Sequence, residues 1–199
     1  HLSNFDTLLA IYTGNSVSAL TTVASNDDDG SSNGTSGLIF IAQAGVTYQV
    51  AVDGRNGATG GFVFNLKYAP PVNDNFSART AISSSSGQAT GVTVAATPET
   101  GEPSHAGLAP GSSVWWNWTA PAAGQITIDT HGSGVGTVLA AYTGTSVNGL
   151  TSQAANNNDG SPGGTSSVLF PVQSGVQYPI AVEGDGGAQG NVVLNWSLN

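Results

Sequence analysis

The sequence of 199 residues contains no cysteine and very few charged side chains. The lack of cysteine excludes disulfide bonds, thiolate catalysis and thiolate metal sites. Charged residues make up 8% of the chain, against about 25% in ordinary soluble domains. Three of them are cationic, namely Arg55, Lys67 and Arg79. Because so few cations cannot track a phosphate backbone or an anionic lipid surface, we expect no nucleic acid as a partner.

Long hydrophobic runs are also missing, since no stretch approaches the roughly 20 apolar residues of a transmembrane helix. We therefore expect no membrane insertion. No signal peptide is found, so a secreted protein would be represented here in its mature or excised form. The net charge of −9 favours solubility and leaves carboxylates for divalent cations. The 28 glycines, with many Thr and Asn and little Lys, are typical of bacterial extracellular β-proteins and predict an extracellular or cell-surface location.

Internal repetition is the strongest feature that the sequence does have. The pattern Thr-Leu-Leu-Ala-Ile-Tyr-Thr-Gly at 7–14 returns 130 residues later as Thr-Val-Leu-Ala-Ala-Tyr-Thr-Gly at 137–144. The offset holds without a gap, and about half of the paired positions between Ser3 and Ala69 are identical. Such self-similarity indicates tandem repeats with a period of 130 residues. Residues 70–199 span one period, so residues 1–69 match the second half of a unit.

Short apolar segments separated by Gly, Asn and Pro indicate β-strands, and helical periodicity is absent. In the first copy we expect strands at 7–12, 17–24, 38–41, 48–52 and 62–66. Before the second copy we expect further strands at 91–95, 113–119 and 125–130. The pair Pro70 and Pro71 forms a stiff connector. We predict an all-β fold of antiparallel, jelly-roll-like β-sandwich repeats, with half a unit at 1–69 and a complete unit of eight or nine strands at 70–199.

Two groups of motifs carry a resemblance to a known family. The first group comprises Asn-Asp-Asn-Phe at 73–76, residues 96–107 and Ser-Val-Trp-Trp-Asn-Trp-Thr-Ala-Pro at 113–121. The second comprises residues 5–14, Asn-Asp-Asp at 26–28 and Tyr-Gln-Val-Ala-Val-Asp-Gly at 48–54. Together they resemble bacterial pre-peptidase C-terminal (PPC) domains and related β-sandwich repeats of large secreted and surface proteins. The resemblance implies the fold over essentially the whole chain, but such modules accompany proteases, glycosidases and adhesins alike.

The acidic loop before Gly30 is a candidate calcium site. It offers several hard oxygens on a turn-rich backbone, and a carboxylate just before the first strand could join them. The candidate ligands are Asp6, Asn26, Asp27, Asp28 and Asp29. Some collagenase-associated members of the PPC group bind calcium, so the resemblance implies the same cofactor. The second copy replaces three of these carboxylates, by Gly136, Asn157 and Asn158, so a strong site is not expected in both copies. The alternative is that the loop side chains only cap a β-turn.

The tryptophan-rich segment is a candidate for stacking on carbohydrate. In a strand, Trp116 and Trp118 share one face while Trp115 points the other way, so at least one ring could be exposed. We name Trp115 and Trp116 as the candidate platform for a polysaccharide. The alternative is that these rings belong to the core, where tryptophans are mostly found.

No catalytic residues are predicted. One loop carries Glu99, Glu102 and His105, which could suggest acid–base or metal chemistry. However, no further histidine or cysteine completes a zinc set, and His131 has no recognisable partner in the sequence. The sequence contains no nucleophile elbow, no His-Glu-x-x-His and no phosphate loop. We therefore interpret the loop as architecture and expect that the protein is not an enzyme.

Half a sandwich would expose its inner apolar face, including Leu9, Ile11, Phe40 and Val52. The half unit could be cut from a longer array, completed by strands of a neighbouring subunit, or packed on the full unit. We predict an extracellular structural or adhesive tandem-repeat module that assembles with copies of itself or adjacent repeats into a surface array or filament. The alternative is a carbohydrate-binding accessory module of a secreted enzyme.

Overall fold

The computed structural model describes residues 3–43 and 45–199 and divides into two compact units. Unit 1 comprises His1–Lys67 and unit 2 comprises Tyr68–Asn199, so the division falls just before the Pro70-Pro71 connector. The described elements are β-strands and single turns of 3₁₀ helix, which confirms the predicted all-β class. Within the described ranges, no helix has the length and apolarity of a membrane span.

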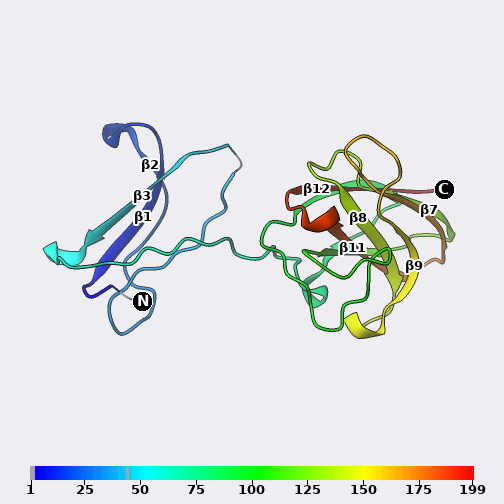
Figure 1. Ribbon diagram of the computed structural model, residues 1–199, viewed down its shortest axis with the longest axis horizontal. Helices are drawn as coiled ribbons and strands as arrows, with labels where there is room; N and C mark the ends of the chain where they lie inside the picture. The colour runs from blue at the N-terminus through cyan, green and yellow to red at the C-terminus, as the bar shows by residue number, and fades with distance from the viewer. Residues whose placement is uncertain (1–2, 44) are drawn as a thin grey trace. The chain divides into compact units, whose positions relative to one another are not determined.

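Unit 2 is a sandwich of two β-sheets (Figure 1). One sheet has five strands in the order β4-β6-β11-β8-β9, which comprise Thr80–Ile82, Val114–Thr119, Gln177–Gly184, Thr137–Thr143 and Thr151–Asn156. The other has four in the order β10-β7-β12-β5, which comprise Ser167–Val172, Gly124–Asp129, Asn191–Leu198 and Ser86–Val92. All neighbours are antiparallel except β4 and β6, which are parallel. The nine strands agree with the expected eight or nine.

The core of unit 2 follows from the alternation of side chains along its strands. Trp116 and Trp118 of β6 face the core between the sheets, whereas Trp115 belongs to a second cluster on the other side of its sheet. Glycine in β5 leaves room for the large rings. A Cβ atom on Gly91 would lie 2.9 Å from the ring of Trp116, so a larger residue there would displace the indole.

Unit 1 contains one sheet of three strands in the order β2-β1-β3, which comprise Thr21–Asn26, Thr7–Thr13 and Tyr48–Gly54 (Figure 1). Its register repeats that of unit 2. Leu9 pairs with Asn26 as Leu139 pairs with Asn156, and the register shifts after the same strand position in both copies. The 3₁₀ turns are η1 Val17–Ala19 and η2 Arg55–Gly57 in unit 1, and η3 Phe76–Ala78, η4 Val147–Gly149 and η5 Asp185–Gly187 in unit 2.

The strands expected at 38–41 and 62–66 are not formed in unit 1, and that prediction was wrong. In unit 2 the matching strands β10 and β12 do not pair with each other, because β7 lies between them and pairs with both. The described part of unit 1 holds no counterpart of β7, so both segments lack a ladder partner and stay irregular. The strand expected at 17–24 is likewise divided between η1 and β2.

Candidate functional site

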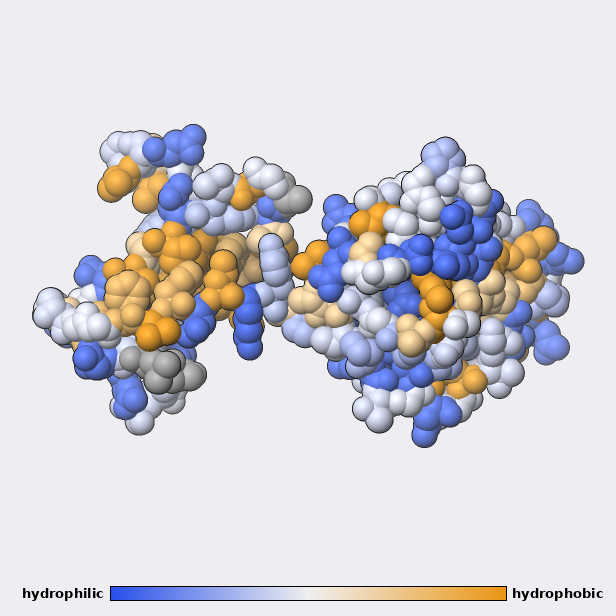
Figure 2. Space-filling view, viewed as in Figure 1, coloured by the Kyte–Doolittle hydropathy of each residue, from blue (hydrophilic) through white to orange (hydrophobic). Residues whose placement is uncertain are grey.

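The apolar side of unit 1 is its most unusual surface. Four side chains there are 43%, 53%, 43% and 76% exposed, namely Val50, Phe62, Phe64 and Leu66. We call these four residues the open face. Their counterparts in unit 2 are 0%, 1%, 0% and 7% exposed, namely Ile180, Val192, Leu194 and Trp196. Hydrophobic residues accordingly gather over the unit that carries β1–β3, as Figure 2 shows. Exposed apolar surface of this kind is typical of a binding site for another polypeptide.

Strand β3 adds an unpaired edge to the open face. Within the described residues it pairs with β1 on one side only, whereas its counterpart β11 lies between β8 and β6. In unit 2 the β6 residues from Val114 to Thr119 occupy that second edge. An edge strand beside exposed apolar side chains can accept a further strand through its main-chain N–H and C=O groups.

The five candidate calcium ligands divide into two groups. One carboxylate oxygen from each of Asp6, Asp27 and Asp28 lies within 4.8 Å of the others. A cation of the chain itself is already there, because Nη1 of Arg55 lies 3.9, 3.4 and 3.4 Å from those three carboxylates. Oδ1 of Asp6 and of Asp27 is nevertheless buried without a hydrogen bond among the described residues. These residues could therefore hold a divalent cation only if it displaced or joined the guanidinium.

The other two candidates, Asn26 and Asp29, stabilise the loop. Oδ1 of Asn26 accepts a hydrogen bond from the N–H of Gly37 at 3.2 Å. Oδ1 of Asp29 accepts one from the N–H of Ser31 at 2.9 Å. Hydrogen bonds from the side chain and the N–H of Ser31 lower the pKa of Asp29 below its ordinary value of 3.8. Turn capping, the alternative named from the sequence, thus describes Asp29, whereas Asn26 joins the end of β2 to Gly37 across the loop.

Sequence reasoning missed Arg55, although a comparison of the two copies contains the signal. Arg55 is replaced by Asp185 in unit 2, where Asp27 and Asp28 have become Asn157 and Asn158. The cation and its anionic partners are lost together. Such paired replacement is expected when the charges neutralise one another.

The structure contradicts the proposed carbohydrate platform. The side chains of Trp115 and Trp116 are 0% and 1% exposed, so neither ring offers a face to a sugar. Trp116 lies between the sheets, as strand alternation allows. The ring of Trp115 is covered because Phe76 and His105 pack edge-on against it, with centroids 5.3 and 5.6 Å away. Both are core residues, which is the alternative that burial statistics favoured.

A buried polar chain fixes the loop that covers Trp115. Oε1 of Glu102 accepts hydrogen bonds from the hydroxyl of Ser113 and from Nε2 of His105 at 3.0 Å. Burial alone would raise the pKa of Glu102, but hydrogen bonds from His105, the N–H of Glu99 and Ser113 hold it below 4.5. Burial raises the pKa of Tyr142, whose hydroxyl contacts the same imidazole. These groups are out of reach of any substrate, so the arrangement is structural.

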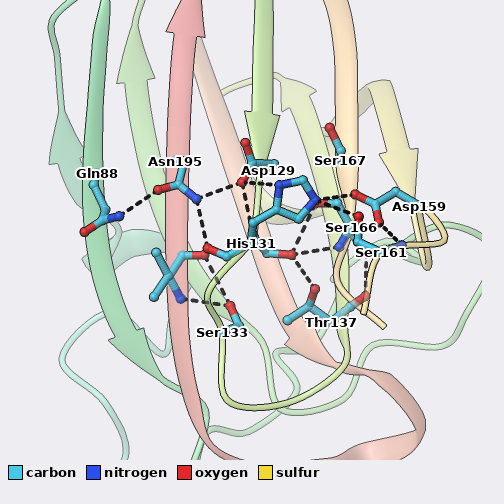
Figure 3. A network of polar contacts seen from close by, with 12 residues as sticks. Gln88, Asp129, His131, Ser133, Thr137, Asp159, Ser161, Ser166, Ser167 and Asn195 are labelled. Carbon is cyan, nitrogen blue, oxygen red and sulfur yellow. Dashed lines mark hydrogen bonds and ion pairs between the residues drawn. The ribbon is translucent and has the colours of Figure 1, made fainter. Parts of the chain in front are cut away.

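A second polar network lies at the surface of unit 2 around His131 (Figure 3). Nδ1 lies 3.2 Å from Oδ1 of Asp129, and Nε2 lies 2.7 Å from Oδ2 of Asp159. The hydroxyl of Ser161 is 3.2 Å from the same Nε2, a set that superficially matches a nucleophile, base and acid. The nitrogen that would take the proton of Ser161 instead faces a carboxylate, so it donates and is not a free base. The network joins the turn after β7 to the loop after β9.

Comparison with known proteins concerns the fold. No protein-family model and no curated protein matches the chain. Among solved structures, the chain is similar to the pre-peptidase C-terminal domain of collagenase from Bacillus anthracis, with a TM-score of 0.40 and 12% sequence identity. The similarity covers 60% of this chain and 94% of that domain. This is the type of domain that the sequence motifs resemble.

Proposed function

We propose that the protein is a non-catalytic, extracellular tandem-repeat module with a structural role, and that strands of a neighbouring repeat complete unit 1. The open face carries this proposal. Val50, Phe62, Phe64 and Leu66 are exposed in unit 1, while the same four positions are buried in unit 2. A surface that one copy buries and the other presents is suited to assembly.

Burial of the open face by strands of a neighbouring repeat would be energetically favourable. Burial of each large apolar side chain contributes about 1.5–3 kcal/mol, before the entropy of ordering the partner is subtracted. Pairing along the free edge of β3 would add main-chain hydrogen bonds and fix the register. Because the donor and acceptor surfaces would differ, the contact is head-to-tail, and repetition of it produces a surface array or filament.

The polar clusters support a structural role over catalysis. The Glu102–His105 pair is buried, and both ring nitrogens of His131 face carboxylates. Neither cluster combines an accessible nucleophile with a free base. Calcium bound by Asp6, Asp27 and Asp28 would strengthen unit 1 and is a secondary part of the proposal.

Light scattering after size-exclusion chromatography tests the proposal. The full chain is expected to form oligomers or fibres, whereas residues 68–199 alone remain monomeric because that sandwich is closed. Phe64→Glu should abolish assembly by placing a charge on the open face. Val17→Glu is the matched control, since Val17 is exposed in η1 and lies outside the open face. Monomers of both chains, or assembly that survives Phe64→Glu, would reject the proposal, and retention of the monomer on polysaccharide would favour the carbohydrate-binding alternative.

A further inference from the structure

The strand that separates β10 from β12 in unit 2 has no counterpart among the described residues of unit 1. Strand β7 pairs with both neighbours and buries Ile126 and Ile128 completely. Ile128 is opposite Trp196 of β12, and Ile126 is opposite Phe170 of β10. The counterparts of Trp196 and Phe170 are Leu66 and Phe40, which retain apolar side chains at both positions.

A buried polar contact follows β7 directly. The N–H of Thr130 donates to the carbonyl oxygen of Ser166 at 2.9 Å, and the N–H of Ser166 donates to Oγ1 of Thr130 at 2.9 Å. The hydroxyls of Thr130 and Thr137 lie 2.5 Å apart. All three residues are fully buried, so Thr130 closes a polar gap between β8 and β10.

Unit 1 retains the receiving half of this contact. Thr7 and Ser36 are the identical counterparts of Thr137 and Ser166. The N–H of Ser36 donates to Oγ1 of Thr7 at 3.0 Å, so the threonine of β1 takes the bond that Thr130 takes in unit 2. The hydroxyl of Thr7 thus satisfies the N–H of Ser36 in place of the hydroxyl that Thr130 supplies in unit 2.

A hollow in unit 1 lies at the same place. Its lining includes Thr7, Leu9, Ser36, Val52, Phe62 and Phe64. The counterparts of the apolar members belong to the core cluster of unit 2 that contains Ile126 and Ile128. The hollow therefore has the position and the chemistry of the site that the end of β7 fills, with apolar walls and a polar end.

We propose that unit 1 binds one specific kind of segment, namely the strand equivalent to β7 from another repeat. In unit 2 this segment has the sequence Gln-Ile-Thr-Ile-Asp-Thr at 125–130. The two isoleucines enter the open face, and the final threonine bonds to Thr7 and Ser36. The preceding aspartate accepts a hydrogen bond from Asn65, as Asp129 does from Asn195 at 2.7 Å. This inference rests on the proposed function and names the strand that would pair with residues 38–41 and 62–66, whereas the free edge of β3 corresponds to the edge that β6 occupies in unit 2.

Covalent addition of the segment tests the proposal on the full chain. A copy of residues 70–130 placed directly before His1 restores the 130-residue spacing in the sequence. We expect the added segment to abolish binding of a hydrophobic dye to the open face and to protect residues 59–67 from protease. The same extension in scrambled order is the control for length and composition. Unchanged dye binding and proteolysis, or equal protection by the scrambled extension, would overturn the proposal.

A labelled peptide of residues 122–133 provides an independent measurement that does not depend on the folding of the extended chain. It should bind the full chain saturably, bind residues 68–199 not at all, and lose at least tenfold in affinity when Ile128 of the peptide is replaced by Asp. Equal binding of the parent and Ile128→Asp peptides would contradict the proposal. If the segment binds unit 1 but the full chain never self-associates, the proposed β7-type partner stands and the proposed assembly between chains is rejected. If the full chain self-associates but does not bind the segment, the proposed assembly stands and the proposed β7-type partner is rejected.

Discussion

Nδ1 of His105 lies 2.6 Å from the hydroxyl oxygen of Tyr142, and both side chains are buried. Nε2 of the same ring lies 3.0 Å from Oε1 of Glu102, so both ring nitrogens have partners. Tyr142 comes from β8, whereas Glu102 and His105 come from the long loop before β6. The contact therefore fastens that loop over Trp115 and gives the predicted candidate loop a structural role.

Removal of the tyrosine hydroxyl should destabilise unit 2. Tyr142→Phe leaves Nδ1 of His105 buried without its partner, which costs about 1–3 kcal/mol of unfolding free energy. Tyr12→Phe is the matched control, because Tyr12 is the counterpart in β1 and its hydroxyl has no hydrogen bond among the described residues. Its effect should stay within about 0.5 kcal/mol. Urea unfolding measures both, and equal losses would contradict the assigned role.

Glu102 should contribute to acid unfolding. Its pKa is held below the ordinary value of 4.5, so the native state binds this proton more weakly than the unfolded state. The stability that its carboxylate provides is present above pH 4.5 and is lost as the pH falls through the lowered pKa. Glu102→Gln should therefore differ most from the parent at neutral pH and least in acid. A difference in urea midpoint that is constant from pH 7 to pH 3 would refute this.

Glu183 should show the opposite pH dependence. Burial raises its pKa above 4.5 although the N–H of Gly111 donates to its Oε2 at 2.6 Å. The native state then binds the proton more tightly, and stability falls as the pH rises through the interval above 4.5. Glu183→Gln keeps an oxygen for Gly111 and removes the charge. Relative to the parent, this variant should be more stable at pH 7 than at pH 4, as chemical unfolding at the two pH values would show.

The two copies should respond differently to the same truncation. Leu194→Ala removes a fully buried side chain from the core of unit 2 and should cost about 2–5 kcal/mol. Phe64→Ala at the equivalent position of unit 1 removes a side chain that is 43% exposed and should cost clearly less than Leu194→Ala in the unassembled chain. Thermal unfolding at low protein concentration compares the two. A large loss from Phe64→Ala would show that the open face is already packed.

Arg55 should compete with calcium for the three carboxylates. Arg55→Gln removes a positive charge 3.4 Å from Asp27 and Asp28, which is worth about 1 kcal/mol between exposed charges, or roughly fivefold in calcium affinity. Lys67→Gln is the matched control, because it removes the same charge outside the cluster. Calorimetric titration with calcium should show tighter binding for the first variant alone. Absence of calcium binding to Arg55→Gln would exclude the site.

The sequence by itself determined the all-β fold class. Alternating apolar residues and glycine turns specify strands locally, which is why β1, β3, β6 and β7 lie close to their expected ranges. Similar local patterns in the two copies fold into the same local pairing, as the shared register of β1 with β2 and of β8 with β9 shows.

Tertiary structure alone decided which of these patterns became strands and which candidate sites formed. A strand needs neighbours that accept its main-chain hydrogen bonds and pack against its side chains. Residues 62–66 are therefore irregular in unit 1, where the described residues hold no counterpart of β7, whereas the matching strand β12 of unit 2 forms next to β7. The burial of Trp115 depends on His105, which is close only because a distant loop folds back. Arg55 reaches Asp6 and Asp27 in the same way, across positions that no local pattern connects.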